Sequence, residues 1–121
     1  MIKIDYTNSR SIHEQIEDGI KKLIVNKILQ ADEQLPSVRD LSVSLTVNPN
    51  TVQKSISLLE SEGLVVIKGT QGCFVTEDRR FLVKAKENQA KKLAKKLVET
   101  AKELSIDSDE MLNLIKEEYE K

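Results

Sequence analysis

The chain has 121 residues, of which 39% are hydrophobic and 32% are charged, with a formal net charge of −1 and a pI near 5.9. This length suits one modest domain with an appendage. No apolar run approaches the roughly 20 residues of a membrane-spanning helix. The start lacks the apolar stretch of a signal peptide, so we expect a cytoplasmic protein with no membrane partner.

Cys73 and His13 are the only cysteine and the only histidine. This composition excludes an internal disulfide and a Cys/His metal site within one chain. No Gly-rich phosphate loop or acid–base constellation is present. We therefore expect neither an enzyme nor a cofactor.

The first predicted element is a helix over about residues 11–26. Ser11 followed by Glu14 forms the capping box S-x-x-E, which marks the amino end of a helix. Apolar residues then recur at positions 12, 16, 20, 23 and 24, a spacing that predicts one buried face. A polar connector follows from Gln30 to Gln34.

A second helix is predicted to begin after Pro36 and to end at about residue 45. Pro36 suits the position just before a helix, and Ser37 is a good N-cap. Its expected buried stripe is Val38, Leu41 and Leu45.

A third helix is predicted over residues 49–62, after a turn formed by residues 46–48. Asn48 is a good N-cap and Pro49 a good first helical residue. Gly63 fits the left-handed position that ends many helices. The expected inward-facing residues are Val52, Ile56 and Leu59.

A β-hairpin is predicted next. The apolar run 64–67 indicates a strand, residues 69–72 supply a turn, and residues 73–75 form the returning strand. Two strands alone are marginally stable, so we expect this hairpin to lie against the helices. The whole pattern predicts a mainly α fold with a small β-hairpin, a winged helix-turn-helix domain over residues 1–76.

Residues 77–121 predict a helical tail, with helices over about 78–104 and after a cap at Asp107 or Ser108. An amphipathic helix of this kind must bury its apolar stripe. We expect the stripe to pair with a second copy of the chain, and folding back onto its own domain is the alternative. The residues expected at the dimer interface are Leu93, Leu97, Val98, Ala101, Leu104, Met111, Leu112 and Ile115.

The charge of the tail is divided along its length. Residues 79–96 contain eight basic residues and one acidic residue, whereas residues 97–121 contain three basic and eight acidic ones. This division could bring a basic surface near DNA and keep acidic groups away from it. A solvated helix face with blocks of charge is the alternative.

The second and third helices have the order of a helix-turn-helix unit, whose second helix enters the major groove amino end first. Asn and Gln side chains can bond adenine, Thr can contact a thymine methyl or a phosphate, and Lys can neutralise a phosphate. Polar residues at a helix start are also ordinary capping chemistry. The apolar anchors and the wing favour the DNA-binding hypothesis.

Arg39 opposes the helix dipole in the first turn of its helix, which a nearby phosphate or base edge would explain. The alternative is a surface ion pair with Asp40 or Glu33. The tip of the hairpin is expected to approach DNA, and a plain turn is the alternative there. The full set of expected DNA-contacting residues is Ser37, Arg39, Asn48, Asn50, Thr51, Gln53, Lys54, Lys68, Gln71 and Gly72.

Four segments together resemble the winged helix-turn-helix domain of the GntR family of bacterial transcription regulators. They are IHEQI (12–16), LPSVRDLSVSL (35–45), VNPNTV (47–52) and GLVVIKGTQGCFV (63–75). The resemblance covers about residues 8–76, and the short helical tail resembles the YtrA subfamily.

The resemblance implies that Arg39, Asn50, Thr51, Gln53 and Gly72 contact double-stranded operator DNA and that the tail helices form a homodimer. It also implies repression of an operon for an ABC-type transporter, often together with the regulator's own operon. The chain has no room for the large effector domain of other members. A small-molecule effector would therefore remain unidentified, with a small pocket between tail and winged domain as its candidate site.

The sequence departs from the family pattern at several positions. Lys27 and Asp32 stand where the connector usually has glycines, and the wing's G-x-G is altered because its other glycine is shifted to Gly69. Pro49 stands where some relatives place an arginine that contacts guanine, and His13 replaces a common tyrosine. A protein–protein interaction module without specific DNA binding is the rival function, and it would need an exposed apolar patch on the third helix.

Overall fold

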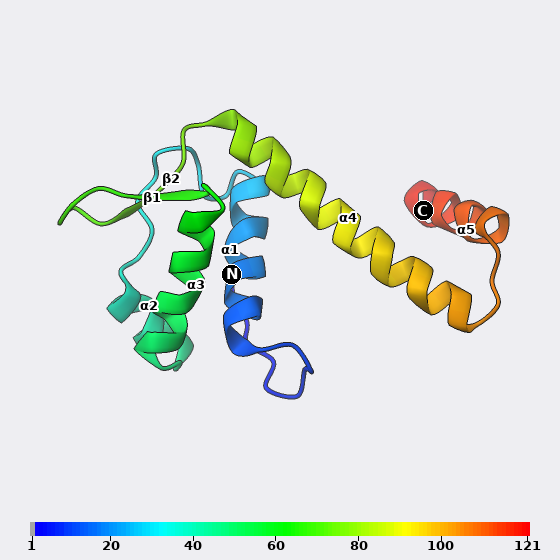
Figure 1. Cartoon of the computed structure of the whole chain (residues 1–121), viewed down its shortest axis with the longest axis horizontal. Coiled ribbons are helices and arrows are strands. Elements are labelled where there is room, and N and C mark those ends of the chain that lie inside the picture. Colours follow the sequence, from blue (N-terminus) through cyan, green and yellow to red (C-terminus); the bar gives the residue numbers. More distant parts are fainter. Residues whose placement is uncertain (1) are drawn as a thin grey trace. The chain divides into compact units, whose positions relative to one another are not determined.

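The computed structural model describes residues 2–121 of the chain. The helices and strands are α1 (Ile12–Val25), α2 (Val38–Leu45), α3 (Pro49–Ser61), β1 (Val65–Ile67), β2 (Cys73–Val75), α4 (Arg79–Glu103) and α5 (Ser108–Glu120) (Figure 1). The chain divides into two compact units, one that ends at Lys86 and one that comprises Glu87–Lys121. The predicted mainly helical fold with a small β-hairpin is confirmed.

The observed bounds of α1 lie within one residue of the predicted ones because its amino end has the expected cap. Ser11 accepts a hydrogen bond from the backbone N–H of Glu14 at 3.3 Å, and its hydroxyl donates to the Glu14 carboxylate at 3.1 Å. Ile16, Ile20 and Ile24 are buried along one face of the helix. This face forms one side of the core.

α2 begins at its predicted cap and ends in the predicted turn. Ser37 accepts a hydrogen bond from the N–H of Asp40 at 3.0 Å, and Thr46 ends the helix in a left-handed conformation with φ 54° and ψ 49°. The prediction that one stripe of α2 is fully buried was wrong. Val38, Leu41 and Leu45 pack against the core but are only half-buried, because this short helix lies at the edge of the core.

α3 packs against both α1 and α2 and supplies the centre of the core (Figure 1). Val52, Ile56 and Leu59 are buried, as predicted. Ser55 is fully buried as well, and its hydroxyl donates to the carbonyl oxygen of His13 on α1 at 2.9 Å. This hydrogen bond fixes the amino half of α3 against the first turn of α1.

Replacing Ser55 with alanine is expected to lower the free energy of unfolding by about 1–2 kcal/mol, because a buried carbonyl oxygen loses its donor. Urea denaturation followed by circular dichroism measures this change. Ser57→Ala, at an exposed position of the same helix, is the matched control and should change the free energy by less than about 0.5 kcal/mol. Equal losses in the two variants would contradict this role of Ser55.

The hairpin is antiparallel, with Val65 opposite Val75. β1 begins one residue later than predicted, and Leu64 is buried in the bend that precedes it. The connector before α2 lies along the other side of β2, where the N–H of Leu35 donates to the carbonyl of Cys73 at 2.8 Å. This additional pairing accounts for the stability of a hairpin whose strands are only three residues long.

Gly63 joins α3 to β1 in a left-handed conformation with φ 77°, as predicted. A Cβ atom at this position would lie 2.5 Å from the ring of Phe81 in the first turn of α4. Both the backbone conformation and the close approach of the ring therefore require glycine.

The predicted tail helices are confirmed. Ser105 turns the chain after α4 with φ 57°, and Asp107 caps α5 by accepting a hydrogen bond from the N–H of Glu110 at 2.8 Å. Ala101 is buried, and its carbonyl accepts a hydrogen bond from the N–H of Ile106. Across residues 2–121, no helix has the length and apolar character needed to cross a membrane.

Candidate nucleic-acid interface

The amino end of α3 is exposed and polar. Asn50, Gln53 and Lys54 are exposed on its first turns, and Thr51 is half-buried. The Asn48 side-chain carbonyl oxygen caps the helix by accepting from the N–H of Asn50 at 2.8 Å. Its amide N–H groups have no hydrogen-bond acceptor among the residues that the structure describes, so they are available to a ligand.

This helix end is suited to bind an anion. The helix dipole gives the amino end of α3 a partial positive charge, although the first N–H groups of the helix, those of Asn50 and Thr51, are already bonded to Asn48. Lys54 adds a full positive charge one turn later. Asn50 and Gln53 carry amide groups and Thr51 carries a hydroxyl group, and these groups match the hydrogen-bonding edges of bases.

Arg39 is exposed in the first turn of α2. The alternative ion pairs with Asp40 or Glu33 are not formed, and among residues 2–121 the Arg39 guanidinium has no acidic partner. Ser37, just before α2, uses its hydroxyl oxygen to cap the helix. The hydroxyl proton remains available for a phosphate oxygen.

Lys68, at the base of the wing turn, is held by the connector. Its Nζ lies 2.6 Å from a carboxylate oxygen of Asp32 and 4.7 Å from the centre of the Phe74 ring. The hydrogen bond lowers the pKa of Asp32 and raises the pKa of Lys68. A contact of Lys68 with DNA would therefore exchange the Asp32 carboxylate for a phosphate.

The other predicted wing residues also contact the connector. The Gln34 side-chain amide donates to the carbonyl of Gln71 at 2.8 Å. Gly72 has φ 125°, and a Cβ atom there would lie 2.6 Å from the Gln34 amide nitrogen. Sequence reasoning missed Asp32 and Gln34 as partners of the wing, because 36 and 37 positions separate them from the residues they bind.

Replacing Gly72 with alanine is expected to lower the free energy of unfolding by about 1–3 kcal/mol, since a side chain strains this backbone conformation. The new Cβ also displaces the Gln34 amide. Gly69→Ala is the matched control, because Gly69 also has a positive φ but a Cβ atom added there would have no neighbouring atom within 4 Å. Differential scanning calorimetry should show a larger loss at position 72; equal losses would mean that the Gln34 contact contributes nothing.

The predicted dimer-interface residues fall into two groups. Ala101 is buried within its own unit, and Met111 and Ile115 are half-buried. The others are exposed. Leu93, Leu97 and Leu104 follow one another along one face of the tail and form an exposed apolar stripe, whereas Val98 lies on another face of α4 and Leu112 on α5.

Cys73 and His13 are the only cysteine and histidine of the chain. Burial, and secondarily the charge of Glu60, raises the pKa of the Cys73 thiol, which disfavours the reactive thiolate. His13 is half-buried, with its Nδ1 3.4 Å from a carboxylate oxygen of Glu17. Within the described part of the chain, no group of three or more His, Cys, Asp and Glu side chains is arranged to hold a metal ion.

A three-helix core with a capped turn and a two-stranded wing defines the winged helix-turn-helix class of DNA-binding proteins. The chain belongs to the GntR family, because the family model described as "Bacterial regulatory proteins, gntR family" matches residues 12–75. This confirms the resemblance found in the motifs.

Relatives match nearly the whole chain. The HTH-type transcriptional regulator YhcF of Bacillus subtilis (strain 168) is 34% identical over 111 residues, 92% of either chain. The HTH-type transcriptional repressor YtrA of the same organism is 34% identical over 118 residues, which cover 97% of this chain and 91% of YtrA. A GntR family transcriptional regulator from Listeria monocytogenes has a solved structure with a TM-score of 0.84 and 29% identity, covering 94% of this chain and 98% of its own. The chain is thus a YtrA-like transcription regulator of the GntR family.

Proposed function

We propose that this regulator is a homodimeric repressor that binds an inverted-repeat operator, with one α3 in each of two major grooves. The exposed polar amino end of α3 is the observation that carries the proposal. The net charge of −1 does not oppose it, because a local positive end can bind phosphate in a protein that is neutral overall.

The contacts divide into two kinds. Arg39 and Lys54, together with Ser37, fix the position of the protein on phosphates, while Asn50, Thr51 and Gln53 contact bases. The amide of Asn48 is an additional donor at the groove edge. At the wing, Lys68, Gln71 and Gly72 approach the neighbouring backbone.

Dimerisation is the proposed role of the tail, residues 77–121, and DNA binding that of residues 1–76. The exposed apolar stripe of the tail supports this division, because large apolar residues that are exposed along one helix face are typical of an interaction site. A second copy of the chain presents the same stripe, and two-fold symmetry matches inverted-repeat sites.

The regulated operon is proposed from similarity. YtrA is named a transcriptional repressor, and the YtrA subfamily typically represses operons for ABC-type transporters. We therefore expect this protein to act on cytoplasmic DNA upstream of a transporter operon that includes its own gene.

Selection of bound sequences from random duplex DNA tests the proposal. It should enrich one sequence whose halves are related by two-fold symmetry. Enrichment of a single unrepeated element would contradict the dimeric arrangement, and no enrichment at all would contradict sequence-specific binding.

The rival interaction module is not supported by the surface of α3. That function needs an apolar outer face, whereas the exposed residues there are predominantly polar. They include Asn50, Gln53, Lys54, Ser57 and Ser61.

A further inference from the structure

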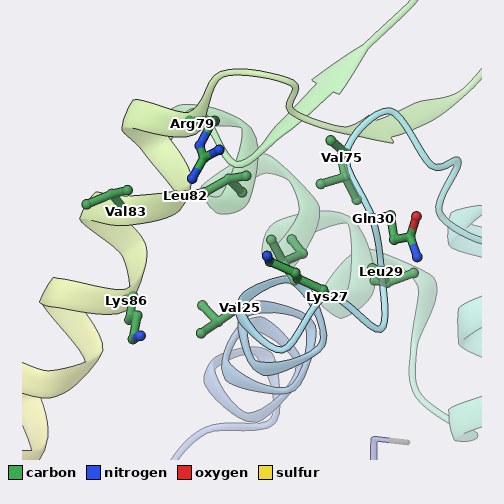
Figure 2. Close-up of a pocket in the computed structure, with 11 residues that line it drawn as sticks. Val25, Lys27, Leu29, Gln30, Val75, Arg79, Leu82, Val83 and Lys86 are labelled. Carbon is green, nitrogen blue, oxygen red and sulfur yellow. The ribbon is translucent and has the colours of Figure 1, made fainter.

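An open cavity lies where the carboxyl end of α1 approaches the first two turns of α4, within the unit that ends at Lys86 (Figure 2). Its volume is about 600 Å³, within the range of about 300–1,000 Å³ found for small-molecule sites. None of its lining residues belongs to the expected DNA-contacting set. The cavity therefore has no part in the DNA contacts proposed above.

The inner wall of the cavity is apolar. Ile24 and Val75, both almost fully buried, lie beside the half-buried Leu29 and Leu82. Figure 2 shows Leu82 of α4 on the side that faces Val25 and the end of α1. Such a wall favours the apolar body of a ligand, because its burial removes apolar surface from water.

The same cavity is lined by three cations and by no acidic side chain. These are Lys27, which follows α1, and Arg79 and Lys86, which lie two turns apart on one face of α4. Figure 2 shows the amine of Lys27 directed toward α4 and the guanidinium of Arg79 directed toward the end of α1.

These three cations have no ion-pair partner among residues 2–121. The neighbouring acids are engaged elsewhere, since Asp78 pairs with Arg80 at 2.7 Å and Glu87 pairs with Lys91 at 3.3 Å. The carboxyl end of α1 contributes only about half a negative charge. The cavity consequently keeps a net positive potential beside an apolar wall.

We propose that this cavity binds a small organic anion that has an apolar body and a phosphate or carboxylate group. The anionic group would form charge-assisted hydrogen bonds with Arg79, Lys27 and Lys86, and the apolar body would lie on the wall formed by Leu29 and Leu82. The inference does not depend on DNA binding and is tested on the protein alone.

Isothermal titration calorimetry with 1-naphthyl phosphate and 1-naphthoate tests the site. Both naphthyl anions should bind at one site per chain. 1-Naphthylmethylammonium, which lacks the anionic group, and inorganic phosphate, which lacks the apolar body, should bind at least about tenfold more weakly. Failure of both naphthyl anions to bind, or equal binding of the ammonium probe, would overturn the proposal. The two anions also distinguish a phosphate ligand from a carboxylate ligand.

Variants locate the binding. The double variant Arg79→Gln with Lys86→Gln should weaken the binding of 1-naphthyl phosphate at least about tenfold, because two charged contacts are lost. Arg80→Gln is the matched control, because Arg80 is adjacent, exposed and paired with Asp78 but does not line the cavity. An equal loss in the control would show non-specific attraction and would overturn the assignment. Perturbed amide resonances of the cavity residues in an NMR titration should accompany binding, and perturbation confined to other residues would also overturn it.

Discussion

Replacing Arg39 with alanine should weaken operator binding about tenfold to a hundredfold, because a hydrogen bond between charged groups, such as arginine and phosphate, is worth about 1.5–3 kcal/mol. Arg39 is exposed and has no acidic partner in the part of the chain that the structure describes. Its removal therefore leaves the fold unchanged. Fluorescence anisotropy with the selected operator duplex measures the affinity, and thermal unfolding checks the stability.

Salt dependence tests the proposed phosphate contact of Arg39 against a contact with a base. If it contacts a phosphate, the slope of log K against log salt should decrease by about one and all sequences should be affected alike. If it contacts a base, discrimination at one operator position should relax instead. Arg80→Ala is the control for lost charge, because the Arg80 side chain pairs with Asp78. Unchanged affinity of Arg39→Ala, or an equal loss in both variants, would refute the assignment.

Helix starts were predictable from the sequence because capping is local. Ser11, Ser37 and Asn48 each accept a hydrogen bond from a backbone N–H two or three residues later. The chemistry of such a cap is complete within four residues of sequence. The position of α3, and with it most of the candidate site, follows from these short-range rules.

The backbone reversals were only partly predictable. Lys27 and Asp32 have φ values of 60° and 63°, at the two positions where the family pattern usually has glycine. The resemblance identified these two positions as departures from glycine, and the structure shows that the left-handed geometry is retained without it. Thr46 and Ser105 are also left-handed, but neither residue type signals this conformation.

Contacts between distant segments were not predictable from one sequence. Ser55 looks like a polar surface residue of a helix, yet it is buried because the His13 carbonyl of α1 lies opposite it. Likewise, Asp32 and Gln34 look like ordinary loop residues, but the connector lies beside the hairpin. Such contacts depend on how the elements pack, and periodicity does not encode packing.

The exposed stripe of the tail is the surface through which we propose that two DNA-binding units are joined. The side chain of Leu93 is 71% exposed and that of Leu104 is 67% exposed. Large apolar residues that recur on one helix face with this exposure are expected to be covered in the working assembly. A dimer also increases operator affinity, because the second half-site is bound at a high effective concentration.

Leu93→Glu should consequently convert the proposed dimer to a monomer. Operator binding should weaken by about a hundredfold or more, because a monomer no longer binds two half-sites at once. The monomer itself tolerates the change because position 93 is exposed, whereas a dimer interface would bury an unpaired carboxylate. Light scattering coupled to size-exclusion chromatography measures the mass, and anisotropy measures the affinity. Asn88→Glu is the matched control, because it adds the same charge at an exposed position on the opposite face of α4. It should leave the mass of the assembly and the operator affinity unchanged. A dimer that persists in Leu93→Glu would place the interface elsewhere, and a monomer with undiminished affinity would remove the need for dimerisation in operator binding.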